Sequence, residues 1–88
     1  MVYVDNFYII ETKAKHGMSK MSHMIADTTE ELMVMADNIG LSREHIQNVG
    51  TWKEHFDVNM SKRDLAIHYG AKEISFRETP KILKNKFI

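Results

Sequence analysis

The sequence predicts an α/β fold, with α+β as the alternative, in which helices pack on a small mixed sheet. Short stretches rich in β-branched and aromatic residues alternate with stretches of helical periodicity, and they account for about four strands and two to three helices. The 88 residues suffice for one small core, so a single compact domain over residues 1–88 is expected. The chain has no cysteine, so packing must hold it together without disulfides or thiolate metal sites.

Two strands are expected in the N-terminal third. Val2-Tyr3-Val4 has the composition of a strand, and Phe7–Ile10 is expected to extend it or to form a second short piece. Residues 11–17 are polar and predict a loop. Residues 18–26 predict the next strand, with apolar side chains on both faces and His23 on one of them. This strand is therefore expected to be central in the sheet.

The helix that follows carries the clearest signals in the chain. Thr28 and Glu31 fit a capping box, in which each side chain bonds the backbone N–H of the other residue. Gly40 is suited to the left-handed conformation at the C-terminal end. A shorter helix is expected over residues 42–48. The apolar positions i, i+3, i+4 and i+7 of the first helix are Leu32, Met35, Ala36 and Ile39.

Residues 55–58 predict a brief strand that leads into a third helix. Along this strand, His55 and Asp57 share one face, and apolar residues share the other. Ser61 is expected to cap the helix at its N-terminus, with Asp64 as an imperfect box partner. The side chains expected to be buried on this helix are Leu65, Ala66 and Tyr69.

The C-terminal segment predicts one more strand and a tail. Residues 71–78 alternate in polarity, with Ile74 and Phe76 facing inward, and Pro80 is expected to stop the strand. Residues 81–88 form a basic tail that docks as a short helix or frays.

Composition narrows the expected partners and compartment. The 12 basic and 12 acidic residues give zero net charge, which disfavours nucleic acid as a partner. No apolar run approaches the roughly 20 residues of a membrane span, so no membrane association is expected. The N-terminus lacks the basic start and long apolar run of a signal peptide. Together with the absence of cysteine, this predicts a cytoplasmic location.

Polar residues gather at the predicted strand ends, where ligands bind in such sheets. His23 and Asp27 share strand parity, His55 and Asp57 share a face, and Asp5 follows the first strand. Two imidazoles and two or three carboxylates can bind Zn²⁺, Mn²⁺ or Mg²⁺. They can equally form acid/base pairs in which an aspartate orients a histidine. The competing interpretation is structural, with Asp27 capping a helix and His23 hydrogen-bonded in the core.

Ser61-Lys62-Arg63 is the second candidate site. A helix start presents unpaired N–H groups and the positive end of the dipole, which suits phosphate. Ser61 and the backbone would bind phosphate oxygens, Arg63 would make a forked contact and Lys62 would add charge. The competing interpretation is an N-cap followed by two solvated cations, which the helix dipole disfavours by about a few tenths of a kcal/mol.

Several blocks of the chain also match a known pattern. They are Val2–Asp5, His23–Asp27, Glu31-Leu32, Met35–Asp37, Ile39-Gly40, His55–Val58, Ser61–Arg63, Leu65–Ile67, Gly70-Ala71 and Glu73-Ile74. With these blocks the chain resembles a small phage and bacterial family catalogued as domain of unknown function 4031. The resemblance implies no activity, but relatives fused to a metal-dependent phosphohydrolase domain imply a connection with nucleotides or phosphate. At His16–Ser19, relatives carry Phe-Gly-Arg-Met, so their arginine is missing here or is replaced by Lys20.

Taken together, the residues predict a domain that binds a phosphate-bearing, nucleotide-like small molecule and can hydrolyse it. The metal, if one is used, is not specified by the sequence. The alternative is a non-enzymatic phage accessory protein that binds a host protein or sequesters a signalling nucleotide. A homo-oligomer is then expected, because a small core gains from self-association. The candidate catalytic residues are His23, His55 and Asp57, and the candidate ligand-binding residues are Asp5, Asp27, Ser61, Lys62 and Arg63.

Overall fold

The computed structural model describes residues 1–9 and 20–85, and over these residues it has one mixed sheet of four strands. The strands are β1 (Val2–Val4), β2 (Met21–Ala26), β3 (Phe56–Asn59) and β4 (Lys72–Glu73). Their order is β3-β2-β1-β4, with β2 antiparallel to both neighbours and β1 parallel to β4. The predicted α/β class, the mixed sheet and the central position of the second strand are therefore confirmed.

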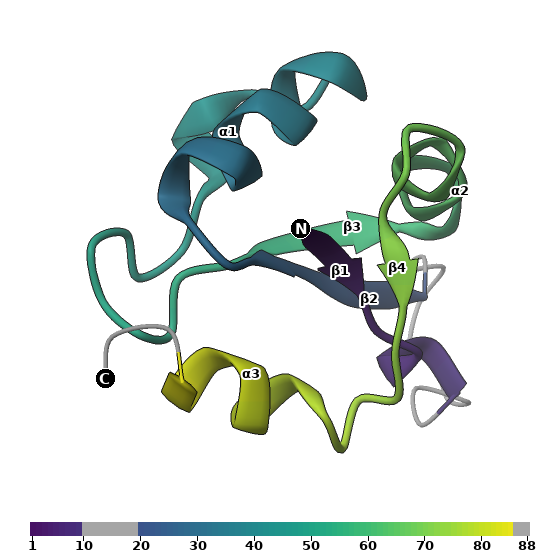
Figure 1. Cartoon of the computed structure of the whole chain (residues 1–88). Coiled ribbons are helices and arrows are strands. Elements are labelled where there is room, and N and C mark those ends of the chain that lie inside the picture. Colours follow the sequence, from purple (N-terminus) through teal and green to yellow (C-terminus); the bar gives the residue numbers. More distant parts are fainter. Residues whose placement is uncertain (10–19, 86–88) are drawn as a thin grey trace.

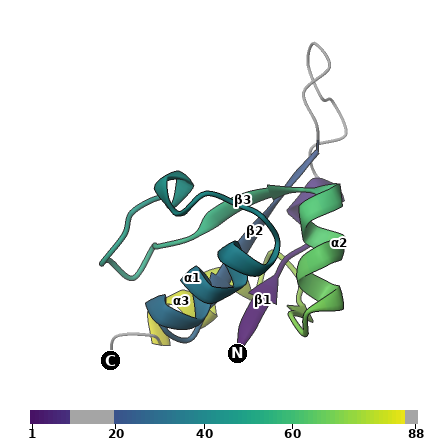
Figure 2. The same ribbon diagram turned by 90° about the horizontal axis from the view of Figure 1, so that it is seen from above.

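Within the described part of the chain, three helices cover the two faces of the sheet. Helices α1 (Thr29–Asn38) and α2 (Met60–His68) lie over one face, and α3 (Thr79–Asn85) lies under the other (Figure 1). Figure 2, viewed from above, shows α1 and α2 next to each other over the strands. No helix among the described residues has the length and apolar content needed to cross a membrane.

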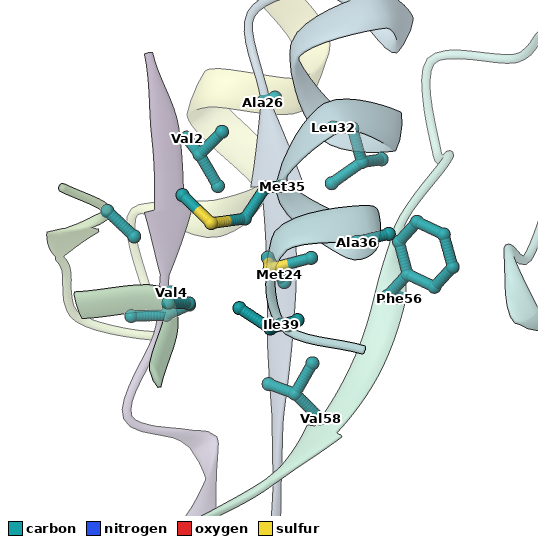
Figure 3. Packing of buried hydrophobic residues seen from close by; sticks show 12 residues of the cluster. Val2, Val4, Met24, Ala26, Leu32, Met35, Ala36, Ile39, Phe56 and Val58 are labelled. Carbon is teal, nitrogen blue, oxygen red and sulfur yellow. The ribbon is translucent and has the colours of Figure 1, made fainter. Parts of the chain in front are cut away.

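The main core lies between the sheet and α1. The strands contribute alternate residues, and Met24 and Phe56 are fully buried against Leu32 (Figure 3). Burial of each such side chain contributes about 1.5–3 kcal/mol. Because successive residues of a strand point to opposite faces, β2 and β3 turn His23 and Asp57 toward the α3 side. The packing of the core therefore decides which polar side chains meet on the second face.

The first helix forms where its sequence predicts, but only half of the predicted capping box is present, because the Glu31 carboxylate accepts the Thr28 hydroxyl at 3.0 Å and not the Thr28 backbone N–H. The Thr28 hydroxyl accepts a hydrogen bond from the Glu31 N–H at 3.1 Å, and Gly40 has a φ of +73°. A residue with a side chain is strained at this φ, whereas glycine is not. Gly40 therefore lets the chain turn at the end of the helix. The four residues predicted for the buried face, Leu32, Met35, Ala36 and Ile39, are all buried.

Two predicted elements, one after β1 and one after α1, are wrong. Phe7–Ile9 form a 3₁₀ turn, η1, and neither extend the first strand nor form a second one, because the Asp5 side chain accepts the Phe7 N–H and closes a turn. The last residue of that predicted strand, Ile10, lies outside the described residues. The predicted helix over residues 42–48 is only a 3₁₀ turn, η3 (Arg43–His45). It ends there because Gln47 pairs with His55 through two backbone hydrogen bonds of 2.8 and 3.1 Å.

The start and the buried face of the third helix also differ from the prediction. Asn59, not Ser61, is the N-cap, and its side chain accepts the Lys62 N–H at 2.8 Å. Leu65 and Tyr69 are 39% and 52% exposed, so the prediction that they are buried is wrong. The buried residues of α2 are Arg63 and Ala66.

The predicted strand over residues 71–78 shrinks to the two residues of β4. The chain then turns, because the Phe76 N–H donates to the Asn6 side chain at 2.8 Å and the Glu78 N–H donates to the Ser75 carbonyl. Pro80 lies in the first turn of α3, where a missing N–H costs little. The tail docks as a helix through Asn85. Its residues 86–88, like the predicted loop over residues 11–17, lie outside the described residues.

Candidate functional site

The site is built around Asp5, which follows β1 and is fully buried. One carboxylate oxygen accepts the backbone N–H groups of His23 and Phe7 at 2.9 and 3.1 Å. The other accepts His23 Nδ1 at 2.8 Å and the Thr79 hydroxyl at 2.9 Å. Asp5 therefore joins β1, β2, η1 and α3 in one hydrogen-bonded cluster. The sequence placed Asp5 only at the edge of a site.

The hydrogen bonds decide the charge of Asp5. Burial opposes its ionisation and is the largest single influence. The hydrogen bonds from the His23 ring and from the two backbone N–H groups outweigh it, and they lower the pKa of Asp5 below its ordinary value of 3.8. An ionised carboxylate only accepts hydrogen bonds, so His23 carries its proton on Nδ1.

His23 lies between two aromatic neighbours. Its ring centroid is 4.9 Å from that of Phe7 and 5.4 Å from that of His55, the latter in an edge-to-face arrangement. Because Asp5 holds one edge of the ring and Phe7 contacts it, the orientation of His23 is fixed. In the neutral ring, the lone pair then lies on Nε2.

Strand register brings the second histidine and its aspartate to the same place. His23 on β2 lies directly opposite Asp57 on β3, and His55 lies two residues before Asp57 on the same face. His55 Nδ1 donates to the Lys53 carbonyl at 2.7 Å, and its Nε2 lies 3.4 Å from Asp57 Oδ1. The other oxygen of Asp57 accepts the Gln47 side-chain amide at 2.6 Å. The predicted pairing of His55 with Asp57 on one face is confirmed.

A cleft of about 260 Å³ adjoins the two histidines on the α3 side of the sheet. Its walls come from β2, from the segment that precedes β3 and from α3. The lining residues are His23, Asn48, Trp52, Lys53, His55, Thr79, Pro80 and Leu83. A larger hollow of about 400 Å³ lies beside α1, but its lining contains no imidazole and no basic side chain. The smaller cleft is the one that combines imidazole side chains with a cation, so we take it as the candidate site.

Three groups in this region are close enough to share one ion. Ligand atoms of His23, His55 and Asp57 all lie within 4.8 Å of one another. The same groups can also act without a metal, since an imidazole next to a carboxylate can accept and return a proton. Both chemistries that the sequence left open thus remain available to the three candidate catalytic residues.

Asp27 lies away from this cluster. Four residues along a strand span about 13 Å, so parity alone does not bring it to His23. Asp27 instead accepts the Tyr3 hydroxyl at 3.1 Å and pairs with the N-terminal amine of Met1 at 3.4 Å. Burial and this hydrogen bond raise the pKa of Tyr3.

The Ser61-Lys62-Arg63 stretch is engaged elsewhere in the fold. Lys62 donates to the carbonyl groups of Ile39 and Gly40, where it caps the C-terminal end of α1. Arg63 is 5% exposed, and its Nε donates to the Asp5 carbonyl at 2.9 Å. Ser61 is exposed. None of the three lines the cleft beside the histidines.

Four residues of the site had no role in the sequence-based interpretation. Phe7 and Thr79 support the Asp5–His23 pair, Gln47 holds Asp57, and Lys53 supplies both a carbonyl to His55 and a charge to the cleft. Their contacts depend on how distant segments come together. The sequence carries a local signal only for Lys53, which lies two residues before the predicted strand.

Comparison with known proteins identifies the family. A family model described as "Protein of unknown function (DUF4031)" matches residues 2–86 of the 88-residue chain. The chain belongs to this family, which confirms the resemblance found in its sequence blocks. No curated protein and no solved structure matches the chain. The family description assigns no activity, so the chemistry must be argued from the site itself.

Proposed function

We propose that this protein binds a compact phosphate-bearing small molecule, of the nucleotide class, in the cleft beside His23 and His55. The observation that carries the proposal is that two imidazoles and one ammonium group, that of Lys53, line the same cleft. Small-molecule sites usually measure roughly 300–1,000 Å³. A cleft of about 260 Å³ therefore limits the occupant to a compact molecule.

The polar groups of the cleft suit a phosphate. Lys53 is exposed and carries a full positive charge, and Asn48 adds an amide. A hydrogen bond to a charged group contributes about 1.5–3 kcal/mol. Because Lys62 and Arg63 are held in internal contacts, the proposal assigns the cationic role to Lys53.

The apolar side of the cleft suits a flat ring. Trp52 is 39% exposed, and Pro80 and Leu83 lie across the cleft on α3. The Lys53 ammonium lies 5.1 Å from the centroid of the Trp52 ring, so one ligand can contact both groups. A base stacked on a tryptophan typically contributes about 1–3 kcal/mol.

The two histidines add the capacity for reaction. A neutral imidazole can take the proton of a water molecule that attacks phosphorus, and the imidazolium can then protonate the leaving oxygen. In the metal-free site, His55 is suited to this role because Asp57 lies next to its Nε2 and stabilises the imidazolium that forms there. Phosphoester hydrolysis is therefore the reaction class that we propose for the site. If the ligand is recovered chemically unchanged, the site binds it without catalysis.

The fluorescence of Trp52 provides the test, because it is the only tryptophan in the chain. The protein would be titrated with AMP, UMP, inorganic phosphate and adenosine, with N-acetyltryptophanamide in parallel to correct for absorption by the base. We expect saturable quenching by the monophosphates and a much weaker response to adenosine. Chromatography of the recovered nucleotide then separates hydrolysis from binding.

Two variants make the test specific. Lys53→Met should weaken monophosphate binding about tenfold, which corresponds to the loss of one charged hydrogen bond. Lys72→Met is the matched control, because Lys72 is exposed on β4 and lies outside the cleft. This variant should bind the monophosphates with the affinity of the wild type. Absence of saturable quenching up to millimolar nucleotide, or equal losses in the two variants, would contradict the proposal.

A further inference from the structure

We propose that His23, His55 and Asp57 form a binding site for a divalent first-row transition metal ion, of the Zn²⁺ type. The site takes one imidazole from β2, one imidazole from the residue before β3 and one carboxylate from β3 itself. This inference goes beyond the proposed phosphate ligand and does not depend on it, because the three protein ligands bind the ion with or without an occupant in the cleft.

The spacing of the three groups suits one ion. In a tetrahedral site with bonds of about 2.0–2.2 Å, neighbouring ligand atoms lie roughly 3.3–3.5 Å apart. His55 Nε2 and Asp57 Oδ1 already lie 3.4 Å apart. The full set lies within 4.8 Å, so the remaining adjustment, on the His23 side, is about 1 Å.

Each ligand is oriented by a partner on its far side. Asp5 holds Nδ1 of His23 at 2.8 Å, and the Lys53 carbonyl holds Nδ1 of His55 at 2.7 Å. A carboxylate and a carbonyl can only accept a hydrogen bond, so each ring donates its N–H from Nδ1. The lone pair of each neutral ring then lies on Nε2. The Gln47 amide holds one oxygen of Asp57 at 2.6 Å, which leaves Oδ1 on the His55 side.

The same hydrogen bonds make a cation favourable. With its proton on Nδ1, His55 directs a lone pair from Nε2 toward the negatively charged Asp57 oxygen 3.4 Å away. Two electron-rich atoms at that distance repel unless a proton or a metal ion lies near both. A metal ion satisfies both atoms and recruits His23 as the third ligand.

The donor set selects the class of metal. Two imidazole nitrogens and one carboxylate oxygen are typical ligands of Zn²⁺, Fe²⁺ and related ions, whereas Mg²⁺ and Ca²⁺ prefer oxygen ligands. Three protein ligands leave at least one position for water or a ligand oxygen. The cleft lined by His23 and His55 lies beside this site.

The test uses the metal alone, on tag-free protein in phosphate-free buffer. Co²⁺ is titrated while visible absorption is recorded, and Zn²⁺ is titrated by calorimetry. We expect one ion per chain, displacement of Co²⁺ by Zn²⁺, and Mg²⁺ affinity at least tenfold weaker than Zn²⁺ affinity. His55→Ala and Asp57→Asn should each weaken Zn²⁺ binding at least tenfold. His45→Ala is the matched control, because His45 is exposed on η3 and should leave the affinity unchanged.

Each other outcome counts against the site. Absence of saturable Co²⁺ or Zn²⁺ binding, equal affinity for Mg²⁺, or an equal loss in His45→Ala would overturn it. Circular dichroism of each variant checks folding, and Gln47→Ala provides a milder change that removes only the orienting amide. If all variants are folded and none weakens binding, the metal is held elsewhere. The nucleotide titration on Trp52 is read separately, so failure of one proposal leaves the other standing.

Discussion

Arg63→Met separates a structural arginine from a ligand-binding one. In the sequence, Arg63 is a candidate phosphate contact, but in the fold its Nε donates to the Asp5 carbonyl at 2.9 Å. Its guanidinium also donates to the Glu73 carboxylate at 3.1 Å and lies 4.9 Å from the centroid of the Tyr8 ring. Methionine has a similar length but removes all three interactions.

The expected loss of stability follows from these contacts. An unsatisfied buried carbonyl costs about 1–3 kcal/mol, and the loss of the cation–π contact costs about 0.5–1 kcal/mol. The pair with Glu73 adds little, since the Glu73 side chain is 61% exposed. The free energy of unfolding should therefore fall by about 2–4 kcal/mol, out of roughly 4–13 kcal/mol for a domain of this size. The melting temperature should fall by about 10–25 °C.

Urea and thermal unfolding, followed by circular dichroism, measure the loss. Arg43→Met is the matched control, because Arg43 is exposed, pairs with Asp37 on the surface and should lose only a small fraction as much stability. Well below its melting temperature, Arg63→Met should keep the monophosphate affinity of the wild type within about twofold. Full stability combined with lost nucleotide binding would refute the structural assignment of Arg63.

Three further predictions concern the supports of the site and the fold. Asp5→Asn should lower the free energy of unfolding at neutral pH by about 2–5 kcal/mol in urea titrations, because the buried donors around it lose a carboxylate acceptor. Since the pKa of Asp5 is lowered in the fold, its contribution is complete above the ordinary value of 3.8 and is lost as the pH falls through the folded-state pKa. The stability difference between wild type and Asp5→Asn should therefore shrink below about pH 4, and a constant difference would contradict this. Thr28→Ala should lose about 1 kcal/mol in the same assay through the lost N-cap, whereas Ser61→Ala, exposed in the first turn of α2, should lose less. Phe56→Ala should lose about 3–5 kcal/mol by leaving a cavity under α1, and a loss below 1 kcal/mol would show that the core is not packed as described.

The elements that the sequence predicts correctly are those with local causes. The Thr28 cap, the apolar face of α1 and the turn at Gly40 each depend on residues within one or two helical turns. The buried face of α2 has a distant cause, because Arg63 is buried where it contacts Asp5, which is 58 residues away in the chain. Similarly, the Asn6 side chain accepts a hydrogen bond from the Phe76 N–H, 70 residues away in the chain. This contact shortens β4 and starts the turn before α3.

The candidate site shows the same division. Strand parity is enough to place His55 and Asp57 on one face. It cannot supply the antiparallel register that sets His23 opposite Asp57, because register depends on pairing between two strands. Parity also groups Asp27 with His23, although Asp27 lies just past the end of β2 and pairs with Met1, and it does not predict the burial of Asp5. A basic side chain can bind a ligand only if it is not already held in an internal contact. Lys62 is held in such a contact, because its ammonium donates to the Ile39 carbonyl at the end of α1.

His23 and His55 meet on one face of the sheet, and each ring donates a hydrogen bond from Nδ1. Long-range ¹H–¹⁵N spectra of the histidine rings, recorded in mildly alkaline buffer where imidazoles are neutral, measure this directly. We expect the Nδ1–H tautomer for both rings, and a joint shift of both Nε2 resonances when Zn²⁺ is added. The Nε2–H tautomer in either ring, or a Zn²⁺ response confined to one of them, would contradict it.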